Sequence, residues 1–116
     1  MSAIVRHKPK GILSGAVEHG NTVYLAGITA DDQTKDVKGQ TQQILATIDG
    51  LLAAAGTDKS KVLTATIWVS DIRNRPLMNE AYTAWTGTKD LPARACVEAK
   101  MADPNCLVEI MVIAAK

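Results

Sequence analysis

The chain has 116 residues, 47% of them hydrophobic, which fits a single globular domain over residues 1–116 and excludes a disordered protein. Thirteen basic and twelve acidic side chains leave a formal net charge of +1, so no binding of nucleic acid is expected. Two tryptophans, two tyrosines and no phenylalanine also offer few platforms on which bases could stack.

The sequence predicts a cytoplasmic protein without a metal site. Its two cysteines are too few for a disulfide scaffold, and no cluster of cysteine and histidine has the spacing of metal ligands. Residues 1–7 lack the apolar run of a signal peptide, and no apolar stretch reaches the roughly 18–20 residues of a membrane span. We therefore expect reduced thiols and no membrane partner.

The first half of the chain predicts three strands and one helix. Residues 3–7 are expected to form a short edge strand, closed by residues 8–11. Residues 15–18 and 22–28 flank a Gly-Asn turn, which is typical of a hairpin. Residues 37–55 are predicted to be helical because their apolar side chains recur at i, i+4, i+7 and i+8, and Gly56 provides the stop.

The second half predicts a strand, a helix and two more strands. Residues 62–70 are rich in β-branched side chains, and residues 74–85 form a helix with proline in its first turn. Two strands follow, at residues 92–98 and 107–114. The order β-β-β-α-β-α-β-β predicts an α+β fold in which two helices cover one face of a six-stranded mixed sheet.

The predicted strands are apolar on both faces. Odd and even positions of residues 23–28 and 107–113 are mainly apolar, and strands of this kind need a cover on both sides. Two helices can cover only one face, so a second subunit is the expected cover of the other. The sequence thus predicts an obligate oligomer whose site lies partly at an interface.

Two charged residues interrupt the apolar strands near the end of the chain. Arg94 shares a face with Cys96 and Glu98 in residues 92–98, and Glu109 lies in residues 107–114. A turn at residues 103–105 would pair the two strands so that Arg94 lies opposite Glu109. Because isolated buried charges are costly, the pair predicts either a structural ion pair or a site for a small carboxylate-bearing molecule.

The stretch Pro-Ala-Arg-Ala-Cys-Val-Glu at residues 92–98, followed by Val-Glu-Ile at residues 108–110, resembles the reactive-intermediate deaminase (Rid, YjgF-type) family. Weaker matches lie at residues 20–27, 53–56 and 78–82, so the resemblance spans nearly the whole chain. It implies a chorismate-mutase-like fold and a homotrimeric barrel with three sites between subunits. It also implies hydrolysis of 2-aminoacrylate-type enamines and imines to 2-keto acids and ammonia, without a cofactor.

The resemblance implies roles for individual residues. Arg94 falls at the position that binds the substrate carboxylate, and Glu109 falls at the acid that activates water. Cys96 and Asn79 fall at positions that line the substrate pocket. These types suit the chemistry, because arginine binds a carboxylate through two parallel hydrogen bonds and a carboxylate can act as general acid and base.

Two positions depart from the family pattern. Many members have a tyrosine where this chain has Leu13, and a serine before Gly27 where this chain has Ala26. Both changes remove polar contacts from the expected pocket, in which backbone N–H groups near Ala26 and Gly27 could orient water or substrate. The general chemistry is retained, but the departures argue against assuming the family's standard small substrate.

Other functions are compatible with the same fold. A non-catalytic protein could hold a keto acid in the same clefts, and the less polar pocket keeps this alternative open, because such a pocket could bind a ligand without positioning water. An RNA-cleaving or protein-protecting role is attached to some relatives, but the near-neutral charge counts against RNA. Cys96 could instead be a small buried side chain, and Asn79 a surface or capping residue.

Overall fold

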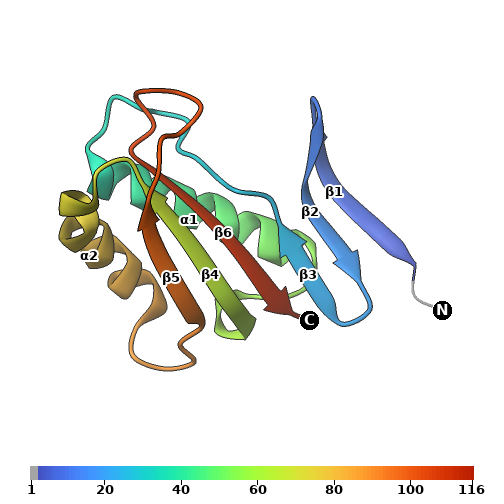
Figure 1. Cartoon of the computed structure of the whole chain (residues 1–116). Coiled ribbons are helices and arrows are strands. Elements are labelled where there is room, and N and C mark those ends of the chain that lie inside the picture. Colours follow the sequence, from blue (N-terminus) through green and yellow to red (C-terminus); the bar gives the residue numbers. More distant parts are fainter. Residues whose placement is uncertain (1–2) are drawn as a thin grey trace.

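A six-stranded mixed sheet with two α-helices on one face forms the computed structural model, which describes residues 3–116 (Figure 1). The helices are α1 (Val37–Ala54) and α2 (Arg75–Thr86). The strands are β1 (Ile4–Lys10), β2 (Leu13–His19), β3 (Thr22–Leu25), β4 (Val62–Val69), β5 (Ala93–Glu98) and β6 (Val108–Ala115). Both the predicted α+β class and the predicted order of elements are confirmed.

The strands are arranged in the order β1-β2-β3-β6-β4-β5. Strands β1, β2 and β3 form an antiparallel meander, and β6 lies antiparallel to both β3 and β4. Strand β5 lies parallel to β4 at one edge of the sheet, because α2 carries the chain back across the sheet between them. The other edge is β1, so the two edges come from opposite ends of the sequence (Figure 1).

The predicted pairing of the last two strands is wrong. Strand β4 lies between β5 and β6, so these two strands do not touch each other as a hairpin. Residues 99–107 are held at the end of β4 on both sides: Ala99 N–H donates to the carbonyl of Val69, and Ser70 N–H donates to that of Leu107. The connection therefore passes over the end of β4 and delivers β6 to the far side of that strand.

The first two strands are longer than predicted and pair with each other as a hairpin. Strand β1 continues through Pro9 to Lys10, and the turn lies at Gly11, whose φ of +57° glycine adopts without a steric penalty. Proline is tolerated because β1 is an edge strand and needs no N–H on its outer side. Strand β3 is shorter than predicted and ends at Leu25, after which Ile28 forms a single bridge with Ile110 of β6.

Helix α1 follows its predicted range closely. The side chain of Asp36 accepts a hydrogen bond from the N–H of Gly39 and caps the helix, and Gly56 at φ +79° follows its end. Buried Gln40 ties the helix to its surroundings, because its side chain donates to the carbonyl of Asn105 and accepts from the N–H of Leu107. These bonds fix the loop that leads into β6.

The core lies between the helices and the sheet. Alternate residues of β4 and β6 face α1 and α2 and are buried, whereas the intervening residues face away from the helices. On that second face Tyr24 and Val97 are nearly half exposed. Residues 3–116 do not cover this open face, in agreement with the apolar pattern on both sides of the strands. Across residues 3–116, neither helix has the length and apolar character needed to cross a membrane.

Candidate functional site

Glu109 lies on the open face of the sheet, near the start of β6. It pairs across the antiparallel ladder with Trp68 of β4, whose other neighbour is Val97 of β5. Its carboxylate packs directly on the backbone of Gly27, because a Cβ atom at position 27 would fall 2.2 Å from Oε2 of Glu109. Glycine is thus required at position 27 for this side chain to keep its place.

The segment after β3 brings Gly27 to Glu109. The N–H of Ala26 donates to the carbonyl of Gly15 at 2.9 Å, which holds it against β2. The N–H of Ile28 donates to the carbonyl of Ile110 at 2.9 Å, and the reverse bond measures 3.1 Å. These bonds hold Gly27 between β2 and β6.

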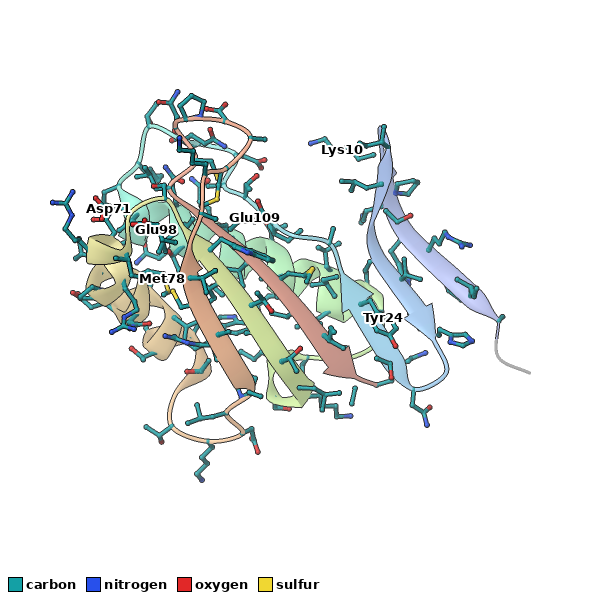
Figure 2. All side chains as sticks on the ribbon, viewed as in Figure 1. Lys10, Tyr24, Asp71, Met78, Glu98 and Glu109 are labelled. Atoms are coloured by element: carbon teal, nitrogen blue, oxygen red, sulfur yellow. The ribbon has the colours of Figure 1, made fainter. Side chains whose placement is uncertain are left out.

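A cavity of about 810 Å³ opens beside Gly27. It lies between the tip of the β1–β2 hairpin, the segment after β3 and the C-terminal half of α1, and both Leu13 and Ala26 line it. Figure 2 shows Lys10 at the hairpin tip and Glu109 on the main body of the sheet, on either side of this region. The structure thus brings together four of the predicted site residues: Leu13, Ala26, Gly27 and Glu109.

Arg94 lies elsewhere, on the helix-covered face of β5. Its Nη1 donates to Oδ1 of Asn79 at 2.8 Å, and its guanidinium carbon lies 4.8 Å from the centre of the Tyr82 ring. Asn79 and Tyr82 are three residues apart on α2 and so occupy one helix face. Together they hold the guanidinium at a hollow of about 450 Å³, which they line with Arg94 and the loop before β5.

Tyr82 is a member of this group that the sequence did not single out. Only its spacing from Asn79 could have indicated that both meet Arg94. Its side chain is 5% exposed, and its hydroxyl has no hydrogen-bond partner among the described residues. Burial raises the pKa of this phenol, while the positive charge of Arg94 opposes the rise. The ring therefore stays neutral and offers its π face to the cation.

Cys96 follows Arg94 on the same face of β5. Its register partner is Ile67, and its half-buried side chain packs against the core as a free thiol. The prediction that Arg94, Cys96 and Glu98 share one face is confirmed by their register against β4. Glu98 has a structural contact of its own, because its Oε1 accepts a hydrogen bond from the N–H of Ile72.

The predicted meeting of Arg94 and Glu109 does not occur within one chain. Arg94 pairs with buried Ala65 and lies on the helix side, whereas Glu109 pairs with Trp68 on the open side. The two charges are thus separated by the sheet itself and by the intervening strand β4. A structural ion pair between them within one chain is excluded by the same geometry.

The predicted residues therefore fall into two half-sites. The acidic half-site consists of Glu109, Gly27, Ala26 and Leu13, and the basic half-site consists of Arg94, Asn79 and Cys96. Among residues 3–116, no three acidic, histidine or cysteine side chains gather closely enough to hold a metal ion. The available chemistry is that of a carboxylate beside an apolar cavity and of a guanidinium with unused donors.

Comparisons with known proteins agree with this architecture. Residues 4–116 match the family described as Endoribonuclease L-PSP. A RutC family protein of Haemophilus influenzae is 39% identical over 115 residues, covering 96% of this chain and 97% of the relative. A YjgF family member from Neisseria meningitidis superimposes with a TM-score of 0.95 at 36% identity, covering 98% of this chain and 95% of that one. A Rid family protein of unknown function from Yersinia pestis superimposes with a TM-score of 0.88 at 30% identity, over 100% of both chains.

Proposed function

Because the chain belongs to the Endoribonuclease L-PSP family, which here includes YjgF and Rid proteins, we propose that it is an enamine and imine deaminase. It would hydrolyse reactive intermediates of the 2-aminoacrylate type to 2-keto acids and ammonia. One observation carries the proposal: the chain presents a held guanidinium and a carboxylate on separate surfaces, each next to an open cavity. Hydrolysis of an imino acid needs both groups, a cation that binds the substrate carboxylate and an acid–base group that activates water.

Arg94 would bind the substrate carboxylate. A guanidinium carries five N–H donors, and the contact with Asn79 occupies one nitrogen, Nη1. The remaining donors suffice for two parallel hydrogen bonds to a carboxylate, which fix its orientation as well as its charge. The ring of Tyr82 beneath the guanidinium carbon limits the movement of Arg94, so less freedom is lost when the substrate binds.

Glu109 would act as general base and then as general acid. It would accept a proton from a water molecule whose oxygen attacks the imine carbon and forms the new C–O bond. The same proton would return to nitrogen and give a carbinolamine, in which one carbon carries a hydroxyl and an amine. Glu109 would then move the hydroxyl proton to that nitrogen as the C=O bond forms and the C–N bond breaks, so that keto acid and ammonia leave and the carboxylate is restored. Such proton transfer contributes on the order of 10²–10⁴-fold to a rate. No cofactor takes part in this sequence.

The separation of the two half-sites favours a site shared between subunits. Since Arg94 and Glu109 lie on opposite faces of one sheet, one substrate can meet both only if they come from different copies. The uncovered sheet face, with Tyr24 and Val97 nearly half exposed, offers a surface on which copies could associate. We propose a homotrimer with inter-subunit sites, in a cytoplasmic setting that its two free cysteines support.

Two alternatives share the same surfaces. A keto-acid-binding protein would use Arg94 in the same way and would leave Glu109 without a catalytic task. The family description and two similar solved structures carry the word endoribonuclease, which makes RNA cleavage the other alternative. A net charge of +1 does not favour the binding of a polyanion, so the deaminase remains the proposal.

The test couples an amino-acid oxidase, which generates imines in situ, to the purified protein. Semicarbazide traps free imine, so a deaminase lowers semicarbazone formation. Wild type should lower the signal from alanine- and leucine-derived imines, whereas Arg94→Ala and Glu109→Ala should restore it. Full turnover by Arg94→Ala would overturn the assigned role. Tight keto-acid binding without turnover would favour the binding protein, and RNA cleavage lost in Glu109→Ala would favour the ribonuclease.

A further inference from the structure

The cavity beside Gly27 is larger and more apolar than a three-carbon imino acid requires. Its volume is about 810 Å³, and Ile12, Leu13, Ile28 and Leu51 contribute apolar side chains to its wall. Ile12 is fully exposed and Leu13 is 51% exposed, and both lie at the tip of the β1–β2 hairpin. Two exposed branched side chains facing a cavity mark a surface that an apolar ligand would cover.

Helix α1 leaves additional room in this cavity. Gly50 lines it, and a Cβ atom at that position would meet no atom within 4 Å. Glycine is unfavourable inside a helix, and neither a close contact nor a positive φ requires it here. The space at Gly50 therefore belongs to the cavity rather than to the packing of the helix.

Three residues of the acidic half-site, Leu13, Ala26 and Gly27, line the cavity, whereas Glu109 lies outside its wall. Gly27 lines the cavity and at the same time touches the carboxylate of Glu109. A substrate whose reacting carbon lies at Glu109 would have its side chain next to this opening. Resting on the proposed function, we infer that the cavity is the side-chain pocket and that it selects imines of large apolar amino acids, such as leucine and methionine.

Charged groups lie at the border of the cavity and define the competing prediction. Lys8, Lys10 and Asp31 line it together with the apolar residues, and no ion pair joins them among the described residues. If the lysines dominated, an acidic side chain would be preferred. A panel that contains alanine-, leucine-, methionine- and glutamate-derived imines separates the two possibilities.

The experiment measures kcat/KM for each imine with wild type and two cavity variants. A single methylene in an apolar pocket changes kcat/KM by roughly 10–200-fold, so the leucine-derived imine should exceed the alanine-derived one at least about tenfold. Gly50→Leu and Leu13→Tyr should each lower that ratio by about tenfold or more. Leu77→Tyr is the matched control, because Leu77 is an exposed leucine on α2 that lines neither cavity, and it should leave the ratio unchanged.

A binding measurement keeps this inference separate from the proposed function. Calorimetric titration compares 4-methyl-2-oxopentanoate with pyruvate, and the branched keto acid should bind at least about tenfold more tightly, a preference that Gly50→Leu removes. Turnover that favours alanine or glutamate, or a ratio unchanged in Gly50→Leu, would overturn the inference and leave the deaminase standing. Absence of turnover on every imine would overturn the deaminase, and equal keto-acid affinities would then overturn the side-chain pocket as well.

Discussion

The contact between Gly27 and Glu109 allows us to predict the effect of adding one methyl group at position 27. In Gly27→Ala the new Cβ would lie 2.2 Å from Oε2 of Glu109, so the carboxylate must leave its position. The backbone at position 27 does not require glycine for its φ angle, so the fold should tolerate alanine and the melting temperature should not fall. We expect kcat/KM for imines to drop at least about tenfold, toward the loss on removing a general base.

A double-mutant cycle identifies the cause of that loss. If Gly27→Ala acts only by displacing Glu109, it should have no further effect in a Glu109→Ala background. Two independent losses that multiply would show instead that position 27 contacts the substrate directly. Melting temperatures of all four proteins control for unfolding.

The stacking of Arg94 on Tyr82 makes a second prediction at this scale. Tyr82→Phe keeps the ring and removes a buried hydroxyl that has no partner among the described residues, so activity should be retained. Tyr82→Leu removes the cation–π contact, which is worth about 0.5–2 kcal/mol, or about 2- to 30-fold in an equilibrium. The effect should appear as a higher KM for imines and weaker keto-acid binding. An equal loss in the phenylalanine variant would contradict this role.

A buried carboxylate connects the N-terminal hairpin to the end of the chain. Glu18 of β2 is 8% exposed and accepts hydrogen bonds from His7 of β1 and from Nζ of Lys116, the latter at 2.5 Å. The bond from Lys116, followed by that from His7, lowers the pKa of Glu18 from its ordinary value of 4.5. Because the folded state holds this proton more weakly than the unfolded state, the stabilisation is complete above pH 4.5 and is lost as the pH falls through the lowered pKa.

Glu18→Gln should therefore lower the melting temperature at pH 7, and the difference from wild type should shrink as the pH falls below 4.5. Glu80→Gln is a matched control, because Glu80 is exposed and pairs with Lys38 on the surface at 3.3 Å. A surface pair of this kind contributes little, so the control should follow wild type at every pH. A pH-independent difference for Glu18→Gln would show that packing, not charge, is responsible.

Helices and strands that depend on local sequence patterns could be predicted, whereas the pairing of the strands with one another could not. The apolar spacing in residues 37–55 and the stop at Gly56 locate α1 to within one residue, since both signals act within a few turns. The pairing of β5 and β6 failed because a turn sequence at residues 103–105 does not decide which strand a chain meets next. That choice was made by α2, whose crossover places β5 parallel to β4 and leaves the other edge of β4 for β6.

The same distinction between local pattern and strand pairing applies to the candidate site. The chemical types of Arg94 and Glu109 stand out in the sequence because charges in apolar strands are costly. Their positions relative to each other depend on the strand order, so the predicted contact between them was wrong. Tyr82 escaped prediction for a related reason: a buried tyrosine in a helix ordinarily fills the core, and only the packing of α2 against β5 places it under Arg94.

At the scale of the whole molecule, each half-site supplies the charged group that the other lacks. The basic half-site lies by the edge strand β5, and the acidic half-site lies beyond β4, between β6 and the β1–β2 hairpin (Figure 1). In a closed ring, every subunit can present its basic half-site to one neighbour and its acidic half-site to the other. Such a head-to-tail arrangement uses each half-site once and leaves none unmatched.

This arrangement predicts that two inactive variants restore each other. Arg94→Ala retains Glu109, and Glu109→Ala retains Arg94, so a mixed assembly contains sites with both residues. Random reassortment in a ring should make about one site in four intact, giving about a quarter of wild-type activity after the two variants are unfolded and refolded together. Refolding Arg94→Ala with the doubly substituted chain is the control, because no site there can contain arginine. If the mixture stayed as inactive as the control, Arg94 and Glu109 would not act across a subunit boundary.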